Sequence, residues 1–381
     1  MTSGINKTIR TMRGIAIAAV TIAIARAGLN QMGAAVERQM ASWLGSFEKG
    51  ASEQVASPVS YGADSVPPVM SNPRPLFGGS EPAPEPSAPP RLFADPQSPS
   101  LNLLGDRPAT ASVPQGNPIS FTRRQIGAVR FYHARLDLRD PTTFITVGLA
   151  NNAKVANSRA HYGGREKFPG MVKRSHGALT VNGTFFSGDQ RSRVMGNLIA
   201  EGRVLKYSRW ENYGTTLGLT ADGNGVKQAE MMTARVDGRP KWENHWFSLT
   251  AGPRLVRQGK LWLAPKSEGF RDRRVFAGKA KRSAIGISKD GRYLHLVTFI
   301  SPITLTQEAH IMIALGARDA MNLDGGSSLG VAHRGKVLLN PPRSLTNVLV
   351  VYDRHNPAPQ RIRDRWARFR DGDRLSLPGL N

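Results

Sequence analysis

The sequence contains no cysteine, and acidic residues are scarce in it. Without cysteine the chain has no disulfide, no thiolate metal site and no cysteine nucleophile. Its 381 residues carry 52 Lys and Arg against 28 Asp and Glu, a formal net charge of +24. This excess predicts an anionic partner, but charge alone does not distinguish nucleic acid, a membrane surface and an acidic or phosphorylated glycan.

The motifs of several common enzyme classes are also missing. No two of the eight histidines stand at a spacing typical of zinc ligands. No nucleophile elbow, Walker loop or dinucleotide-binding fingerprint is present. We therefore expect neither a metal site nor a cofactor. No DNA- or RNA-binding signature occurs, so nucleic acid is not an expected partner.

The chain begins with a pattern typical of export. Basic residues precede the apolar run 14–25, and Arg26 follows it. Spanning a bilayer takes roughly 20 apolar residues, so this run is short for a membrane helix. Residues 1–35 are predicted to be a secretory signal peptide or an N-terminal membrane anchor, with an amphipathic helix docked on the domain as the alternative. Export would place the rest in the periplasm or outside the cell, tethered to the membrane if anchored.

Proline divides the chain into parts. Residues 51–120 hold 15 of the 26 prolines, together with three basic and six acidic side chains. Such a segment buries too little apolar surface to offset the entropy lost on ordering. We therefore predict a disordered Pro-rich linker over residues 36–120, a folded domain over 121–353 and a basic tail over 354–381. The positive charge accordingly gathers in the domain and its tail.

The folded part is rich in strand and turn signals. Strands are predicted at residues 144–149, 178–186 and 217–219. A hairpin is predicted from 283–288 and 293–300, which flank an Asp-Gly turn.

One helix is clear, beginning at a capping box of Thr304 and Gln307 and ending at Gly316. Short strands are predicted after it at residues 320–323 and 347–352. Because strands cluster and helices are few, the predicted fold class is α+β, a single domain with a mixed or antiparallel sheet.

The sharpest candidate site follows a buried strand. Asp324 is followed by Gly325 and Gly326, and then by Ser327 and Ser328. Glycines let the backbone approach a ligand closely, and successive amides there can form a nest for an anion. One carboxylate among many donors suits a phosphate or a sugar phosphate. An ordinary Asp-Gly hairpin turn is the structural alternative.

Further candidates lie elsewhere in the domain. Asn182-Gly183 interrupts an apolar run, either as a bulge that aims Asn182 into a site or as a type I′ turn. An arginine alone is a weak signal, because most arginines are solvated surface residues. The other polar candidates stand at strand entries or in the loop before the last strand: Arg254, Arg282, Arg343 and Asn347.

Taken in order, these segments resemble the phosphodiester glycosidase family. That family has an Asn-Gly-x-Phe-Phe strand, a Gly-Pro-x-Leu hairpin, an Arg-Thr-Ala-Ile-Gly strand, a helix with a Glu-Leu-Ala-like start, an Asn-Leu-Asp-Gly-Gly-x-Ser-Ser segment, and a basic loop leading to Asn and a Val-rich strand. The matching segments here are 182–186, 252–255, 282–286, 308–309, 322–328 and 343–351. The resemblance covers roughly residues 125–353.

The resemblance implies a hydrolase that cleaves the glycosidic bond of a sugar-1-phosphodiester. The export pattern and the positive charge favour an envelope or exopolysaccharide glycan as the substrate. The leaving group is a phosphate monoester with a second pKa of about 6, so it needs little protonation. One carboxylate with cationic and amide stabilisation can then suffice.

We assign Asp324 the role of nucleophile or general base. The arginines Arg282 and Arg343 would bind the phosphate, and Asn182 and Asn347 would orient sugar hydroxyls. Asn182 and Arg282 complete the predicted catalytic set. The remaining predicted substrate-binding residues are Gly183, Arg254, Glu308, Gly325, Gly326, Ser327 and Ser328. Glu308 matches a family position and would otherwise favour its helix N-terminus electrostatically.

Two other functions stay open at this point. A metal-assisted phosphodiesterase would use Asp324 as a metal ligand. A non-catalytic envelope module would bind anionic polysaccharide through its basic face.

The basic tail contains a short amphipathic pattern. Ile362, Trp366 and Phe369 fall on one face of a helix, with arginines around them. This face would rest on an anionic membrane surface or dock on the domain.

Overall fold

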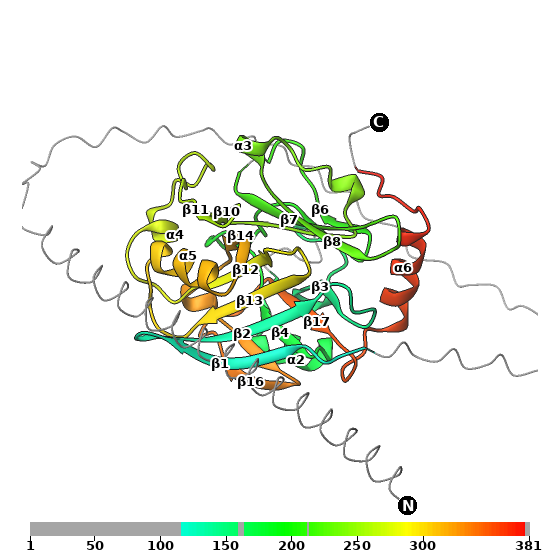
Figure 1. Cartoon of the computed structure of the whole chain (residues 1–381), viewed down its shortest axis with the longest axis horizontal. Coiled ribbons are helices and arrows are strands. Elements are labelled where there is room, and N and C mark those ends of the chain that lie inside the picture. Colours follow the sequence, from blue (N-terminus) through cyan, green and yellow to red (C-terminus); the bar gives the residue numbers. More distant parts are fainter. Residues whose placement is uncertain (1–115, 159–163, 212, 378–381) are drawn as a thin grey trace, which may run out of the picture. The chain divides into compact units, whose positions relative to one another are not determined.

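The computed structural model describes residues 116–158, 164–211 and 213–377 (Figure 1). The predictions of a signal peptide or anchor over residues 1–35, and of a Pro-rich linker up to residue 115, lie outside these ranges. Within the described residues, no helix combines the length and the apolar character that crossing a bilayer demands.

Three antiparallel sheets make up the domain. The first contains seven strands in the order β1 (Ser120–Ile126), β2 (Val129–Asp137), β13 (Tyr293–Phe299), β12 (Ser283–Ser288), β14 (Ala317–Asn322), β10 (Arg254–Arg257) and β11 (Lys260–Leu261). The second contains β16 (Lys336–Leu339), β15 (Val331–His333), β4 (Leu179–Asn182), β17 (Asn347–Tyr352) and β3 (Phe144–Leu149). The third contains β6 (Arg203–Lys206), β5 (Leu198–Ala200), β9 (Phe247–Ala251), β7 (Thr215–Ala221) and β8 (Lys227–Thr233).

Helices are short and few in the described part. They are α2 (Phe168–Ser175), α3 (Ala234–Asp237), α4 (Arg273–Phe276), α5 (Leu305–Ala314) and α6 (Gln360–Arg370). Three single-turn 3-10 helices cover Ala150–Asn152, Trp242–Asn244 and Gly326–Ser328. Antiparallel sheets with few helices confirm the predicted α+β class.

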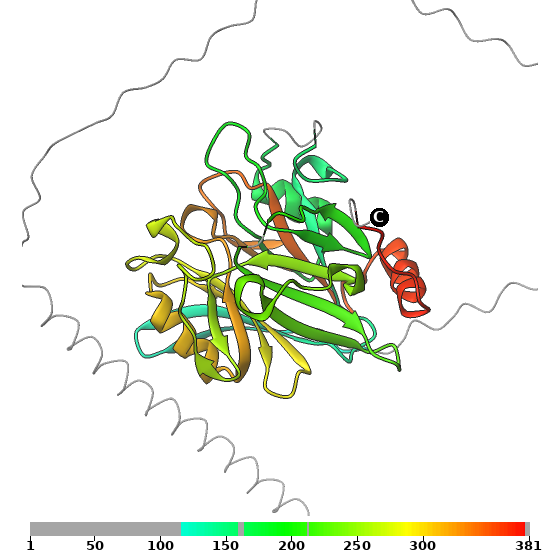
Figure 2. The same ribbon diagram turned by 90° about the horizontal axis from the view of Figure 1, so that it is seen from above.

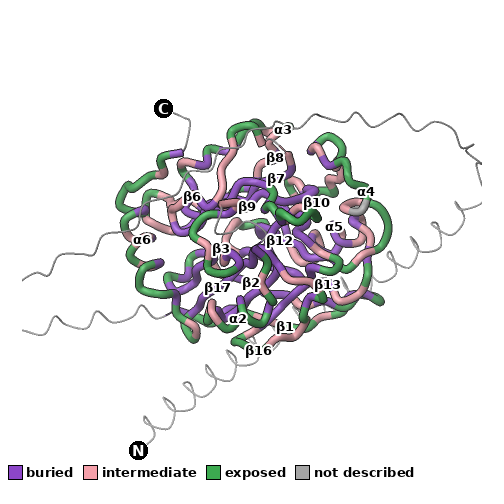
Figure 3. Tube along the Cα trace, turned by 180° about the vertical axis from the view of Figure 1, so that it is seen from behind, coloured by how far each residue is buried: buried purple, intermediate pink, exposed green. Residues whose placement is uncertain are grey.

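The core lies where the sheets face one another. β12 and β17 are buried along their whole length, since both faces of each strand are covered. Figure 3 shows these buried segments running through the centre of the domain. A second apolar cluster lies under α5, whose Ala309 and Met312 pack on the seven-stranded sheet.

Local sequence patterns predict several strands and one helix correctly. The structure confirms the strand at 144–149, the strand at 347–352 and the hairpin of β12 and β13. Both halves of the capping box of α5 are present, because the Thr304 hydroxyl accepts from the Gln307 amide and the Gln307 side chain accepts in return.

The strand predicted over 178–186 is shorter than expected. β4 ends at Asn182, because the side chain of Asn347 binds both the amide and the carbonyl of Thr184 and takes this segment out of the ladder. The prediction of strand beyond residue 182 is therefore wrong, and the Asn182-Gly183 pair marks the end of a strand.

The folded structure also extends past both predicted limits of the domain. Ile119 is buried, and its amide donates to the Asp353 carboxylate over 3.0 Å. At the other end, α6 buries Ile362, Trp366 and Phe369, and the Trp366 ring lies edge-on to Trp246 with centroids 5.3 Å apart. The apolar face of α6 thus docks on the domain and is not free for a membrane surface. Figures 1 and 2 place α6 at the end opposite to α4 and α5.

Replacing Trp366 tests how far the tail is part of the fold. Trp366→Ala removes a large side chain from a packed site, so we expect the free energy of unfolding to fall by about 3–5 kcal/mol. Urea denaturation of the full chain followed by circular dichroism measures this. Asp364→Ala, at an exposed position of α6, should change it by less than about 0.5 kcal/mol. Equal stability of the Trp366 variant and the parent would contradict the docking of α6.

Candidate active site

A cavity of about 390 Å³ opens beside Asp324. Three chain segments and one loop residue line it: 185–188 after β4, 272–282 before β12, 322–327 at the end of β14, and Arg343. β12 pairs directly with β14 in antiparallel orientation. The segment that enters β12 and the segment that leaves β14 therefore lie at the same edge of one sheet. The sheet therefore brings together residues that lie far apart in the sequence.

The Asp324 carboxylate is the central charged group of the cavity. It is 9% exposed, and its Oδ2 lies 3.2 Å from Nη2 of Arg343. Its Oδ1 accepts a 2.9 Å hydrogen bond from the Gly325 amide. Burial raises the pKa of Asp324 above its usual value, although the Ser328 hydroxyl, Arg343 and the Gly325 amide act in the opposite direction. A nearly buried carboxylate that still reaches solvent is suited to act on a bound ligand.

Arg343 is the candidate arginine that remains accessible in this cavity. Its side chain is 34% exposed, and its Nε donates to the Ser328 hydroxyl over 2.7 Å. The guanidinium also lies over the Phe186 ring, 4.1 Å from the centroid. These contacts hold the planar fork beside Asp324, where it can meet a phosphate.

The prediction of an anion nest at the two glycines is wrong. The Gly325 amide is bonded to the Asp324 carboxylate, and the Gly326 amide donates to the carbonyl of Lys281 over 2.8 Å. Both amides are therefore used within the protein. Gly325 is required for a different reason, since a Cβ there would lie 2.6 Å from the Lys281 carbonyl oxygen. Of the two serines, Ser327 is exposed at the cavity, whereas Ser328 is buried.

Asn182 positions the Asp324 loop and does not face the cavity. Its side chain is 1% exposed and donates to the hydroxyl of Ser283 over 3.0 Å and to the carbonyl of Asp324. Its Oδ1 accepts from the Gly330 amide over 3.2 Å. These contacts use both the Nδ2 donor and the Oδ1 acceptor of the side chain. The predicted contact between Asn182 and a sugar hydroxyl is therefore wrong.

Asn347 has the same kind of role at the start of β17. Its Oδ1 accepts from the Thr184 amide over 2.8 Å, and its Nδ2 donates to the Thr184 carbonyl over 3.1 Å. Gly183 permits this contact, because a Cβ on Gly183 would lie 2.0 Å from that same Oδ1. Asn347 and Gly183 therefore shape the segment leading to Phe185 and do not bind substrate.

Arg282 borders the cavity, but its guanidinium is committed to the backbone. Its three nitrogens donate to the carbonyls of Val275, Gly278 and Ile303 at 3.0–3.3 Å. Its side chain is 4% exposed, and Glu308 lies behind it at 4.0 Å. The predicted role of Arg282 in phosphate binding is therefore replaced by one in holding the cavity wall.

Glu308 and Arg254 lie away from the cavity. Glu308 is fully buried, and this burial raises the pKa of its carboxyl well above the usual range. It cannot touch substrate, which corrects its predicted role. Arg254 is 4% exposed and pairs with Asp237 and Asp319, each at 2.7 Å. It links β10 to β14 and the end of β8, which corrects the prediction that it binds substrate.

Several lining residues were not among the predicted candidates. Phe185, Phe186 and Lys281 line the cavity, as does Asp272. Asn322 also lines it, with its Nδ2 bonded to the Gly252 carbonyl at 3.0 Å and its buried Oδ1 without a hydrogen-bond partner among the described residues. A polar side chain closing a buried apolar strand is the signal that points to Asn322 in the sequence. No three potential metal ligands of the His, Asp or Glu type cluster within the described ranges.

One protein family matches part of the chain. Residues 176–352 match the model of the phosphodiester glycosidase family, which confirms the resemblance drawn from the motifs. The matched segment is therefore similar to this hydrolase family, and it includes Asp324 and Arg343. No curated protein matches the sequence.

The solved structures that are similar to the chain include the two that follow. A hypothetical protein from Synechocystis is 17% identical with a TM-score of 0.48, and the alignment covers 64% of this chain and 65% of that one. The chain thus spans slightly less than two thirds of the Synechocystis protein. The zebrafish N-acetylglucosamine-1-phosphodiester alpha-N-acetylglucosaminidase catalytic domain, auto-inhibited by its pro-peptide, is 18% identical with a TM-score of 0.49, covering 64% of this chain and 85% of that one.

Gly183→Ala tests the contact between Gly183 and Asn347. The added methyl group would overlap the amide oxygen of Asn347, so we expect a loss of about 1–3 kcal/mol in the free energy of unfolding. The matched control is Gly188→Ala, because Gly188 follows in the same segment and a Cβ there meets nothing within 4 Å. Urea denaturation of both variants measures the difference. Equal stability of the two would contradict the close approach.

Proposed function

We propose that the protein hydrolyses the glycosidic bond of a sugar-1-phosphodiester in the cavity beside Asp324. The observation that carries the proposal is the pairing of a nearly buried carboxylate with an accessible guanidinium, 3.2 Å apart, in one cavity. The family match of residues 176–352 supports the same reaction class. A cavity of about 390 Å³ lies within the range of small-molecule sites and suits one sugar with its phosphate.

The reaction breaks the bond between the anomeric carbon and the bridging phosphate oxygen. Water adds to the carbon, and the products are a free sugar and a phosphate monoester. The departing monoester has a second pKa of about 6, so it leaves without a strong general acid. A single carboxylate, Asp324, then acts as nucleophile or as general base on the water.

Arg343 would bind the phosphate of the substrate. Its guanidinium is held by Ser328 and by the Phe186 ring, so little side-chain freedom is lost on binding. Lys281 is exposed at the rim of the cavity and adds positive charge in place of Arg282. Both cations stabilise the charge that develops on the leaving phosphate.

The Asp324–Arg343 contact also couples binding to reactivity. In the free protein, Arg343 stabilises the ionised carboxylate and lowers its basicity. A phosphate that takes over donors of Arg343 weakens this stabilisation. Asp324 then becomes the stronger base or nucleophile when substrate is present.

We further propose that the substrate is part of an anionic envelope or exopolysaccharide glycan outside the cytoplasm. The export pattern in residues 1–35 and the net charge of +24 support this location and this class of partner. A membrane anchor at the N-terminus would keep the domain close to such a glycan.

Replacing Asp324 tests the catalytic assignment. In Asp324→Asn the carboxylate is lost at nearly constant volume, so we expect kcat to fall at least about a thousandfold in a folded protein. Release of reducing sugar from a panel of methyl esters of sugar 1-phosphates by the full chain measures this. Asp272→Asn is the matched control, since Asp272 is an exposed carboxylate of the same cavity. It should retain most activity if the phosphate leaves without acid assistance.

Three outcomes would contradict the proposed reaction. Retained turnover in Asp324→Asn would remove Asp324 from the chemistry. In water labelled with heavy oxygen, label in the phosphate product would show cleavage of the P–O bond, as a phosphodiesterase would produce. Binding of the glycan without release of sugar would favour the non-catalytic alternative.

Arg343→Ala tests phosphate binding. Losing a charge-assisted hydrogen bond costs about 1.5–3 kcal/mol, so we expect KM for the same esters to rise at least about tenfold. Lys336→Gln, an exposed charge change on β16 outside the cavity, is the control and should leave KM unchanged. Unaltered KM in Arg343→Ala would contradict the assigned phosphate contact.

A further inference from the structure

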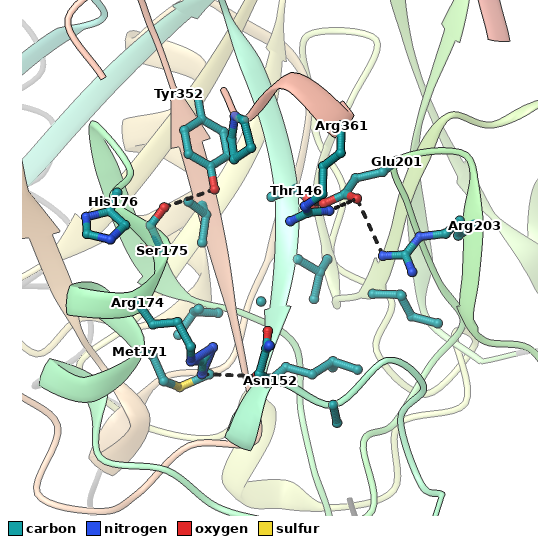
Figure 4. Close-up of a pocket in the computed structure, with 18 of the residues that line it drawn as sticks. Thr146, Asn152, Met171, Arg174, Ser175, His176, Glu201, Arg203, Tyr352 and Arg361 are labelled. Carbon is teal, nitrogen blue, oxygen red and sulfur yellow. Dashed lines mark hydrogen bonds and ion pairs between the residues drawn. The ribbon is translucent and has the colours of Figure 1, made fainter. Parts of the chain in front are cut away.

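Two cavities flank the turn between β5 and β6, away from Asp324. The first, of about 200 Å³, lies between β3, β17, α2 and the start of α6 (Figure 4). The second, of about 350 Å³, runs beside α6 towards Arg374. Glu201 and Arg203 border both, so we treat the two cavities as one feature, the α6 groove.

A single buried carboxylate in the α6 groove faces three arginines. Glu201 is 4% exposed and binds Nη1 of Arg361 at 2.5 Å, Nη1 of Arg365 at 2.6 Å and Nη2 of Arg203 at 3.4 Å. The Thr146 hydroxyl also donates to it, over 3.1 Å. One negative charge therefore meets three positive charges, and two positive charges are left without compensation inside this cluster.

Arg203 is incompletely stabilised by its neighbours in this cluster. Its partial burial lowers the pKa of its guanidinium, and the nearby charges of Arg365 and Arg361 lower it further, although Glu201 acts in the opposite direction. Its Nε is buried and has no hydrogen-bond partner among the described residues. A buried donor without a partner is costly, and an anionic oxygen is the group that would satisfy it.

More cationic side chains extend the cluster along the groove. Figure 4 shows two further polar groups on the wall opposite Arg203: Arg174, which is paired with Glu166, and the Tyr352 hydroxyl, which donates to the Ser175 carbonyl. Arg368 and Arg374 line the second cavity, where Asp373 lies 3.6 Å from Arg368. Arginines thus line both cavities, on each side of the Glu201 cluster.

An ion pair that only anchors α6 needs one arginine for one carboxylate. Two more guanidinium groups around the same carboxylate add like-charge repulsion in a partly desolvated place. A bound anion reduces that repulsion and can accept a hydrogen bond from Nε of Arg203. Guanidinium groups suit phosphate in particular, because their planar fork donates two parallel hydrogen bonds.

We propose that the α6 groove is a second anion-binding site, which takes a ligand carrying two or more phosphate groups. The two arginine-lined cavities share Arg203, so neighbouring phosphates of one ligand would occupy one cavity each. The groove shares no lining residue with the Asp324 cavity. α4, which borders the Asp324 cavity, and α6 lie at opposite ends of the domain (Figures 1 and 2). The proposal does not depend on the hydrolysis proposed above.

Calorimetric titration of the full chain with tripolyphosphate and, separately, with orthophosphate tests the site. Every protein in the series carries Arg343→Gln, which removes the phosphate contact beside Asp324. We expect tripolyphosphate to bind at least about tenfold more tightly than orthophosphate at physiological salt. Adding Arg203→Gln and Arg361→Gln should weaken tripolyphosphate binding at least about tenfold. Arg363→Gln, on the same helix but outside both cavities, should leave it unchanged.

A variant at an exposed position keeps the test valid if the double substitution impairs folding. Arg368 has a side chain 63% exposed, so Arg368→Gln should fold normally and still weaken tripolyphosphate binding. The proposal is overturned if neither variant weakens binding, or if Arg363→Gln weakens it equally, as screened surface charge alone would predict. Equal affinity for the two probes would overturn the requirement for two phosphate groups.

Discussion

Two buried amide side chains hold the candidate active site together. Asn182 at the end of β4 binds the backbone of Asp324, and Asn347 at the start of β17 binds the backbone of Thr184. Buried amides of this kind are stable only when both their donors and their acceptors are satisfied. Their contacts fix where the chain leaves the sheet, and so they fix where the carboxylate of Asp324 and the ring of Phe186 lie.

The partners of each arginine determine which of them is available to a ligand. The arginines that lie deepest are neutralised by the protein itself, Arg282 through backbone carbonyls and Arg254 through two aspartates. Arg343 alone among the candidate arginines stays a third exposed beside Asp324. A partly solvated guanidinium costs little to keep charged, and it can exchange its carboxylate partner for a phosphate. This division separates residues that build the cavity from the residue that can bind in it.

The basic residues of the chain gather in more than one place in the fold. Lys281 and Arg343 account for little of it at the candidate active site. Arg203, Arg361 and Arg365 gather around Glu201 at the opposite end of the domain, where the basic tail packs as α6. Segments that are far apart in the sequence, the β5–β6 turn and the tail, thus form one cationic surface.

Local chemistry made much of the fold predictable from the sequence. The apolar runs of β3 and β17, the Asp-Gly turn between β12 and β13, and the capping box of α5 depend on residues near one another in the chain. The order of the motifs also predicts the similarity to the family that residues 176–352 match. Asp324 is recognisable as a candidate because a carboxylate followed by two glycines ends a buried strand. The roles of the other candidates were decided only by the tertiary structure. Whether Asn182, Arg282 or Glu308 meets a ligand or a neighbouring chain segment depends on how deeply the side chain is buried and on partners up to 148 residues away in the sequence. Neither can be determined from the local sequence.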